Sequence, residues 1–493
     1  MSLQNIVIHR GLLCGCPKVA ASRTESAAPS FRPGHERVTI VLALLFSLCA
    51  AGCSGDASNA KPNTPHANSS GIAKSQPAGL EKLQHIVVIY LENHSFDNLY
   101  GEFEGANGLS KAGEHAIQID RSGQPYKELP RPPGNAFPAH LPNAPFSIEK
   151  YVPIDAKTPD LIHRFYQQQG QIDGGRMDRF AALSDAKGLV MGYYHTRNLP
   201  LAQEAKQNTL CDNFFHAAFG GSFLNHIFLV ALQAPRFPNA PSSMRATLDG
   251  RGYMIRDGAV TPDGFVVNTA FTVNSPHPSS ASRATLVPNQ TMPTIGDRLT
   301  EKQISWAWYS GGWNHAVEGH PDKTFQFHHQ PFAYFANYAD GTTGRAQHLK
   351  DEVEFISAAR SGKLPAVSFV KPLGEVNEHP GYSNVLGGER HVVELLNALR
   401  ASPEWKSTAV IVTYDENGGF WDHQSPPKVD RWGPGARVPT IVISPYAKHN
   451  YIDHTLYDTS SILALIEKRY GLKPLGSRDA AAHDMTAAFD FSQ

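Results

Sequence analysis

Four short apolar runs along the chain have the pattern of buried β-strands. They span residues 85–91, 366–370, 409–414 and 439–444, and none of them contains Asp, Glu, Lys or Arg. Strands that are apolar at consecutive positions, rather than at alternate ones, are buried on both faces. The runs therefore predict a central sheet that is covered on both sides.

Helical periodicity alternates with these runs. Residues 389–399 place apolar side chains three and four positions apart, and residues 459–470 begin with the capping residues Thr459 and Ser460 and end before Gly471. Strands separated by helices are typical of an α/β sheet with mostly parallel strands. Residues 234–295 are rich in Pro, Ser, Asn and Gly instead and predict an insertion of loops and short strands. We expect one domain over residues 81–493.

The N-terminal region has the pattern of a bacterial export signal. Arg32 and Arg37 precede an apolar stretch over residues 38–51, which is shorter than the roughly 20 apolar residues of a spanning helix. Ala50-Ala51-Gly52-Cys53 resembles a lipobox, which predicts a lipid on Cys53 as the membrane contact; cleavage without lipid stays open. We interpret residues 1–53 as a leader, of which residues 1–36 are a gene-model artefact if translation starts near Val38. The polar residues 54–80 then form a flexible tether of a periplasmic, membrane-anchored or secreted protein.

Charge and cysteine content narrow the class of protein. The 44 Lys and Arg residues balance 45 Asp and Glu residues, so there is no basic excess of the kind that nucleic-acid binding requires. Of the five Cys residues only Cys211 lies beyond the predicted leader, which excludes a disulfide within the body of the protein. We expect Cys211 to be buried and structural. The oligomeric state stays open.

Acidic residues follow two of the predicted strands directly. Glu92 and Asn93 come after the first strand, and Asp415 and Glu416 come after the third. In open α/β sheets, ligands bind beyond the carboxyl ends of the strands. If the two strands are neighbours, the three carboxylates need a divalent cation, and oxygen ligands favour Mg²⁺, Ca²⁺ or Mn²⁺. An equally open interpretation is that these are unrelated turn residues.

A glycine pair and several histidines are the other candidates for chemistry. Gly220 and Gly221 allow a tight turn that projects the hydroxyl of Ser222, although Gly-Gly-Ser is also an ordinary loop. Histidines beside Gly and Pro turns are more typical of a site than of a core; they are His163, His328, His329 and His379.

Taken together, these segments resemble a bacterial phosphoesterase family that contains respiratory-burst-inhibiting acid phosphatases and phosphatidylcholine-type phospholipases C. The fold of that family is similar to the alkaline phosphatase superfamily. Six motifs in family order carry the resemblance over residues 84–470, and they lie at residues 92–97, 173–178, 221–226, 328–332, 377–380 and 415–423.

The resemblance implies metal-dependent hydrolysis of phosphate esters through a phosphoserine intermediate. One divalent metal would be held by Glu92, Asn93, Asp415 and Glu416, and Ser222 would be the nucleophile and a further ligand. The phosphoryl oxygens would be contacted by His163, by His379 and by either His328 or His329, with a slight preference for His328. Cationic imidazoles predict an acidic optimum.

The substrate class is the open point. The phospholipase branch commonly has Arg at the position of His94 and Thr at that of Ser222, so this sequence favours an acid phosphatase acting on phosphomonoesters. The enzyme alternative is a phospholipase C that cleaves phosphatidylcholine-like diesters, in which residues 325–335 form an apolar entrance rather than part of the core. The non-enzymatic alternative is an inactive, surface-anchored binding protein.

Overall fold

The structure is a computed structural model that describes residues 78–134 and 136–493. The predicted leader, most of the predicted tether and Cys53 lie outside these residues. Within the described part of the chain, no helix is both long and apolar enough to cross a membrane.

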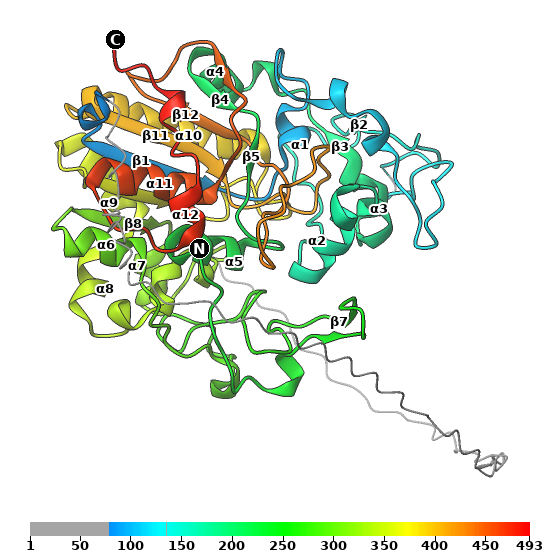
Figure 1. Ribbon diagram of the computed structural model, residues 1–493, viewed down its shortest axis with the longest axis horizontal. Helices are drawn as coiled ribbons and strands as arrows, with labels where there is room; N and C mark the ends of the chain where they lie inside the picture. Colours follow the sequence, from blue (N-terminus) through cyan, green and yellow to red (C-terminus); the bar gives the residue numbers. More distant parts are fainter. Residues whose placement is uncertain (1–77, 135) are drawn as a thin grey trace, which may run out of the picture. The chain divides into compact units, whose positions relative to one another are not determined.

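An eight-stranded sheet runs through the centre of the fold (Figure 1). Its strand order is β13-β4-β12-β11-β1-β10-β8-β9. The strands are β1 (His85–Leu91), β4 (Thr209–Cys211), β8 (Trp306–Ser310), β9 (Leu349–Asp351), β10 (Val367–Lys371), β11 (Thr408–Tyr414), β12 (Thr440–Ile443) and β13 (Tyr451–Asp453).

Five neighbouring strands of this sheet are parallel. They are β9, β8, β10, β1 and β11, whereas β12 runs antiparallel to both β11 and β4, and β13 runs parallel to β4. All four predicted runs are strands of the sheet. The predicted α/β fold with a mostly parallel sheet is therefore confirmed.

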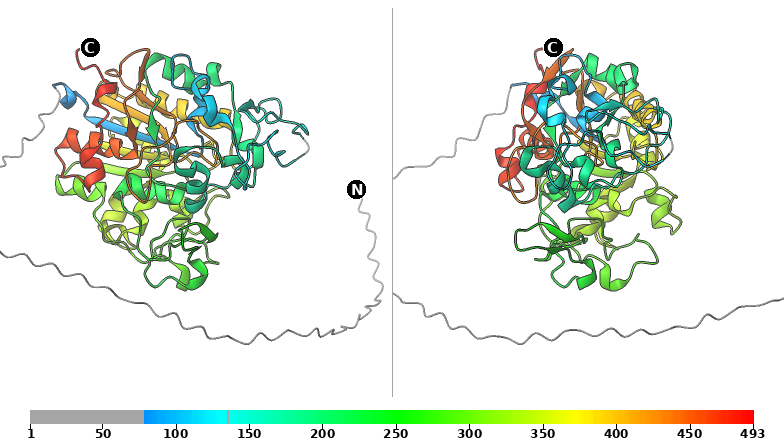
Figure 2. Two further views of the ribbon diagram at one scale, coloured as in Figure 1. Left: turned by 45° about the vertical axis from the view of Figure 1, so that its right-hand side comes forward. Right: turned by 90° about the vertical axis from the view of Figure 1, so that its right-hand side faces the viewer.

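Both faces of the sheet are covered. Every residue of β11 is buried, as is every residue of β1 after His85. Because consecutive side chains of a strand point to opposite faces, this burial requires cover on both sides. Figures 1 and 2 show helices packed against the sheet. Over the whole described part of the chain, on the sheet and away from it, the helices are α1 (Phe96–Tyr100), α2 (Phe165–Ile172), α3 (Phe180–Leu183), α4 (Pro200–Gln207), α5 (Ser222–Ala231), α6 (Ile295–Glu301), α7 (Trp313–Val317), α8 (Thr343–His348), α9 (Glu352–Ser361), α10 (Val385–Arg400), α11 (Thr459–Tyr470) and α12 (Ser477–Ala481).

Short strand pairs lie outside the central sheet. They are β5 (Phe214–Phe215) with β14 (Tyr457–Asp458), β2 (Phe146–Ser147) with β3 (Gly192–Tyr193), and β6 (Thr247–Leu248) with β7 (Met254–Arg256). The last pair belongs to residues 234–295, where isolated bridges and loops make up most of the remainder. This matches the predicted insertion of loops and short strands.

The strand register decides where the polar residues meet. Leu91 at the end of β1 pairs with Tyr414 at the end of β11, so Glu92 and Asp415 follow at the same edge of the sheet. β10 lies on the other side of β1 and ends at Lys371. Polar residues from three adjacent strand ends therefore converge.

Candidate active site

The two acidic segments lie in direct contact beyond the ends of β1 and β11. The backbone N–H of Asn93 donates to Oδ1 of Asp415 (3.3 Å). Asn93 has a left-handed backbone (φ 68°), a conformation that Asn tolerates better than most residues. Gly418 packs so closely that a Cβ on it would lie 2.2 Å from the carbonyl oxygen of Asn93. The glycine after Glu416 is thus required by the close approach of the two loops.

Ser222 is the first residue of α5 and reaches the same point. Its hydroxyl lies 3.1 Å from Oε2 of Glu92 and 3.3 Å from Oδ1 of Asn93. Gly221 makes this possible, because a Cβ there would lie 2.8 Å from the carbonyl oxygen of His163. The hydroxyl also lies at the N-terminus of a helix, where free N–H groups and the helix dipole favour an anion.

The donors at this point fit a hard divalent cation. Glu92, Asp415 and Glu416 are completely buried. Oδ2 of Asp415 and Oε1 of Glu416 are buried without a hydrogen-bond partner among the described residues, which is costly for carboxylate oxygens unless a cation satisfies them. Burial, followed by mutual repulsion, raises the pKa of both carboxyls well above the usual range. A bound cation would remove that penalty.

Lys371 was not among the predicted site residues. Its ammonium is buried, forms an ion pair with Oε1 of Glu92 and donates to the carbonyl oxygen of Leu91 (3.3 Å). Burial alone would raise the pKa of Glu92, but Lys371 and then His329 overcome it and hold that pKa well below its usual range. The sequence did contain a signal: Lys371 follows the apolar run 366–370 directly, as Glu92 and Asp415 follow theirs.

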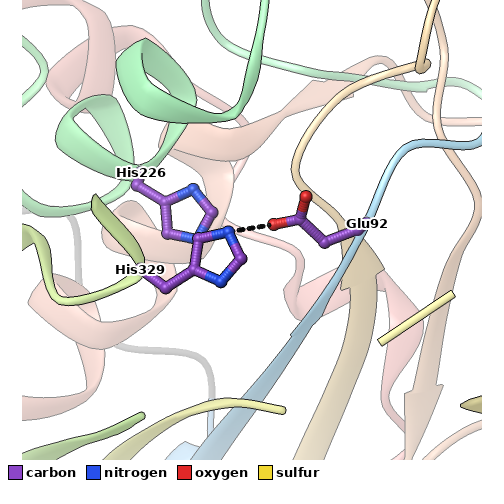
Figure 3. A group of neighbouring side chains, drawn as sticks. All are labelled: Glu92, His226 and His329. Carbon is purple, nitrogen blue, oxygen red and sulfur yellow. Dashed lines mark ion pairs between the residues drawn. The ribbon is translucent and has the colours of Figure 1, made fainter. Parts of the chain in front are cut away.

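His329 and His226 lie against Glu92, as Figure 3 shows. Nε2 of His329 is 2.9 Å from Oε1 of Glu92, and the ring of His329 stacks on that of His226. Nδ1 of His226 donates to the carbonyl oxygen of Ser222 (2.7 Å) and is 3.8 Å from Oδ2 of Asp415. His226 was also missed as a site residue, although it lies one helical turn after Ser222.

His328, by contrast, faces the cavity with no hydrogen bond or ion pair to the described residues. The structure thus separates the pair: His329 is engaged by a carboxylate, whereas His328 is free to contact a ligand. Which of the two rings contacts a phosphoryl oxygen stays a prediction.

His163 and His379 flank the same point from other segments. Nδ1 of His163 donates to the carbonyl oxygen of Leu161, which leaves Nε2 3.4 Å from Nδ2 of Asn93 and 3.6 Å from Oε1 of Glu416. Nδ1 of His379 donates to the carbonyl oxygen of Pro380 (2.5 Å), which leaves Nε2 3.8 Å from Oε2 of Glu92. In both rings Nε2 is the nitrogen that faces the site.

Burial opposes a positive charge on three of these rings. It lowers the pKa of His379 to about 3 and lowers the pKa values of His328 and His329 below the usual value, with neighbouring cationic groups contributing. The physical reason is that an imidazolium loses its hydration when it is buried. The reasoning from solvent-exposed histidines did not include this desolvation.

A cavity of about 400 Å³ opens over these residues. Its wall includes Ser222, Glu92 and the histidines at 163, 328, 329 and 379. Asp160, Asp185, Arg164, Asn268 and Tyr382 also line it and were not predicted. Asn268 belongs to the insertion, so residues 234–295 form part of the cavity wall.

Other motif residues hold the loops rather than line the cavity. Arg437, which is completely buried, donates to Asp422 (Nε–Oδ1 2.8 Å) and Asp97 (Nη2–Oδ1 3.1 Å) and thereby joins α1 to the loop after β11. The segment 173–178 contacts the same loop, since Nε1 of Trp421 donates to the carbonyl oxygen of Met177 (2.8 Å). His94 stacks on Phe420 and is buried.

Cys211 in β4 is buried and free, as expected.

Most aromatic side chains of the segment 325–335 belong to the core. Phe325, Phe332, Tyr334 and Phe335 are buried, and Phe332 packs against Trp306 and Trp308. Between them, Gln326, His328 and His329 line the cavity.

The chain is similar in sequence to several phospholipases C. Phospholipase C B of Mycobacterium tuberculosis is 26% identical over 461 residues, which cover 84% of this chain and 79% of that protein. Non-hemolytic phospholipase C of Pseudomonas aeruginosa is 26% identical over 497 residues, which cover 91% of this chain and 63% of that protein. Non-specific phospholipase C6 of Arabidopsis thaliana is 34% identical over 164 residues, covering 27% of this chain and 31% of that protein.

The similar solved structures have low sequence identities and low TM-scores. A lipoteichoic acid synthase from Listeria monocytogenes is 8% identical, covers 83% of this chain and 79% of its own, and has a TM-score of 0.36. An alkaline phosphatase superfamily protein from Vibrio parahaemolyticus is 10% identical, covers 76% of this chain and 77% of its own, and has a TM-score of 0.33. At these TM-scores the fold class rests on the sheet of this chain itself.

The sequence profile of the Phosphoesterase family matches residues 83–473, which include every residue of the site described above. Three carboxylates beside a serine at a helix start, with histidines around a cavity, suit the hydrolysis of phosphoric esters. The chain belongs to the Phosphoesterase family.

Proposed function

We propose that this chain hydrolyses phosphomonoesters through a phosphoserine at Ser222, as an acid phosphatase does. The observation that carries the proposal is the position of the Ser222 hydroxyl. It lies at the N-terminus of α5, within 3.1 Å of Glu92, on the wall of the cavity that His163, His328 and His379 also line. A nucleophile needs such a combination of access, activation and positive potential.

The residues that would hold one divalent cation are Glu92, Asn93, Asp415 and Glu416, with Ser222 as a further ligand. When bound, the ion would lower the pKa of the serine hydroxyl and neutralise negative charge. The hydroxyl of Ser222 gives its proton to water as Oγ attacks phosphorus, and the bond to the leaving alcohol breaks as that oxygen takes a proton from an imidazole or from water. Water then hydrolyses the phosphoserine and releases inorganic phosphate. Ca²⁺, Mg²⁺ and Mn²⁺ all suit the oxygen donors.

The proton positions support acidic operation once substrate is present. Nδ1 of His163 and of His379 each donates to a backbone carbonyl, so Nε2 donates to a phosphoryl oxygen only when the ring is cationic. A phosphate dianion in contact raises the pKa of an imidazole. His328, which has no hydrogen-bond partner among the described residues, donates in either charge state.

Two observations bear on whether the substrate is a phosphomonoester or a phosphodiester. Charged and polar side chains line much of the cavity, and the aromatic side chains of Phe325, Phe332, Tyr334 and Phe335 are packed into the core, which supports a small polar substrate. The second candidate is a phospholipase C, because the curated relatives carry that name. Parallel assays of p-nitrophenyl phosphate and phosphatidylcholine vesicles distinguish the two.

The test of the nucleophile is the pair Ser222→Ala and Ser222→Thr. Removing the hydroxyl should reduce kcat on p-nitrophenyl phosphate by about 10³-fold or more, whereas Thr keeps a hydroxyl and should retain measurable turnover. Trapping of ³²P on the wild-type protein at acidic pH would identify the phosphoserine. Full activity of Ser222→Ala would exclude the mechanism, and absence of turnover on both substrate classes would favour the inactive binding protein.

The leader supports a further proposal, that the chain is exported and that Cys53 carries lipid. Metabolic labelling with radioactive palmitate tests it. Label should be incorporated into the wild-type chain and lost in Cys53→Ser. A wild-type chain that takes up no label would contradict lipidation and favour ordinary cleavage of the leader.

A further inference from the structure

The hairpin formed by β6 and β7 carries three consecutive apolar side chains into solvent. Tyr253, Met254 and Ile255 are 67%, 39% and 68% exposed. Ile255 lies in β7 and Tyr253 is the residue before this strand; the two are two positions apart, the spacing at which extended backbone turns side chains to the same side. Within the described residues, no other run of consecutive large apolar side chains is exposed. Burying such a patch is favourable, and patches of this kind mark interaction surfaces.

The hairpin holds these side chains out by defined contacts. Oδ1 of Asp249 accepts from the N–H groups of Arg251 and Tyr253, which closes the turn (2.8 and 2.9 Å). The guanidinium of Arg256 donates to the carbonyl oxygens of Ser242 and Arg245, which holds the strand against the preceding segment. The exposure of Tyr253 and Ile255 is therefore built into an ordered turn.

The charge around the patch is positive. Residues 234–295 contain five Arg and three Asp, with no Lys and no Glu. Two of the Asp residues are paired with arginines outside the segment, Asp257 with Arg164 and Asp263 with Arg431. Arg256 follows Ile255 directly, and Arg251 lies two residues before Tyr253. Apolar side chains between arginines suit the boundary between anionic headgroups and acyl chains of a lipid bilayer.

The base of the hairpin is also the rim of the catalytic cavity. Asp257, the residue after β7, is paired with Arg164, which lines the cavity. Nδ2 of Asn268, another lining residue, donates to the carbonyl oxygen of Gly258 (2.8 Å). Figure 1 shows β7 at the edge of the molecule, away from the central sheet. A surface that held the hairpin would thus lie near the cavity rim.

We propose that the β6–β7 hairpin is a docking device for an anionic lipid bilayer, with Tyr253 and Ile255 inserted among the acyl chains and Arg251 and Arg256 at the headgroups. The proposal does not depend on which phosphate ester Ser222 attacks. Because Arg residues contribute to binding, raising the ionic strength weakens it.

The test uses the full chain and vesicles of phosphatidylglycerol and phosphatidylcholine with brominated acyl chains, which quench inserted tryptophan. Ile255→Trp should show quenching beyond that of the wild type. Val353→Trp is the control, since Val353 on α9 is 63% exposed and lies outside the hairpin. No added quenching at position 255 would overturn the proposal.

A second pair of variants measures affinity. Ile255→Asp should weaken co-sedimentation with anionic vesicles by about tenfold relative to the wild type, whereas Val353→Asp should not. Both should hydrolyse p-nitrophenyl phosphate as the wild type does. Equal binding of the two variants would contradict docking. A wild-type dimer that Ile255→Asp dissociates without lipid would assign the patch to self-association instead. If neither the wild type nor the two variants hydrolysed p-nitrophenyl phosphate, that result would refute the proposed enzyme activity and leave the docking proposal untouched.

Discussion

Gly418 shows how a single contact sets the geometry of the loops after β1 and β11. It lies two residues after Glu416 and has a φ of 60°, and its Cα faces the carbonyl oxygen of Asn93. Gly471, after α11, has nearly the same φ (61°), but a Cβ added to it would meet nothing within 4 Å. The two glycines therefore share a backbone requirement and differ only in the space available.

Alanine at each position separates these effects. Gly471→Ala should reduce the free energy of unfolding by about 1 kcal/mol through the left-handed backbone alone. Gly418→Ala should cost about 1–3 kcal/mol more, because the new methyl displaces Asn93, and should also reduce metal affinity. Denaturant unfolding measures the free energy of unfolding, and metal titration measures the affinity. Equal decreases in the free energy of unfolding of the two variants would show that the contact with Asn93 is unimportant.

Lys371 sets the charge of the proposed cation site. Three carboxylates and one ammonium leave two negative charges, which a divalent ion balances. Lys371→Met should therefore shift preference from divalent toward trivalent ions, whereas Lys371→Arg should keep the wild-type preference. Titrations with Mn²⁺ and Tb³⁺ give the ratio of the two affinities. A purely structural role would weaken both ions by the same factor, and that result would contradict the charge argument.

At the scale of elements, the start of α10 packs closely on a neighbouring loop and buries the carboxyl of Glu389. Periodicity predicted residues 389–399, but the helix begins at Val385, capped by Asn384. The first turn contains Gly387 and Gly388, which have poor helix propensity and weaken the signal. Gly388 is needed there because a Cβ would lie 2.2 Å from Cγ of Glu378. The same close packing buries Glu389 beside Glu378.

Glu389 should make stability depend on pH. Burial raises its pKa to about 8, against about 4.3 in an unfolded chain. Between those values the folded state binds more protons than the unfolded state, so stability falls as the pH rises from about 4.3 through 8. Glu389→Gln keeps an acceptor for the N–H of Leu201 and should flatten this decline by on the order of 1 kcal/mol. Urea unfolding at pH 5 and pH 8 measures it, and an unchanged slope would exclude Glu389 as the source.

At the scale of the whole molecule, the cation site joins segments that are far apart in the sequence. Glu92 follows β1, Ser222 begins α5, and Asp415 and Glu416 follow β11. A ligand that binds only the folded state stabilises it by about 2.7 kcal/mol at 100 times its Kd. Chelation should therefore lower the Tm by on the order of 3–5 °C, and the preferred divalent ion should restore it.

Glu416→Gln is the control for this measurement. It removes one carboxylate charge and should show a smaller Tm response to chelation and to added ion. The same Tm with chelator and with Ca²⁺, Mg²⁺ or Mn²⁺ would contradict a structural contribution from the site.

Local patterns were sufficient for β1, β10, β11 and β12, for α11 and for the positions of the acidic residues. The residues of β1 and the bounds of α11 match the apolar run and the helical period, because each pattern records which side chains are buried within one element. Glu92 and Asp415 were found for the same reason, since both come directly after an apolar run.

The structure decided what depends on contacts between distant segments. That Lys371 pairs with Glu92 follows from β10 lying beside β1, and which of His328 and His329 meets a carboxylate follows from the way their turn packs on α5. The low pKa of His379 comes from burial by several elements together. Sequence alone located four strands of the sheet and the acidic residues that follow two of them. Only tertiary packing decided which atoms they face, because desolvation and ion pairing act across space rather than along the chain.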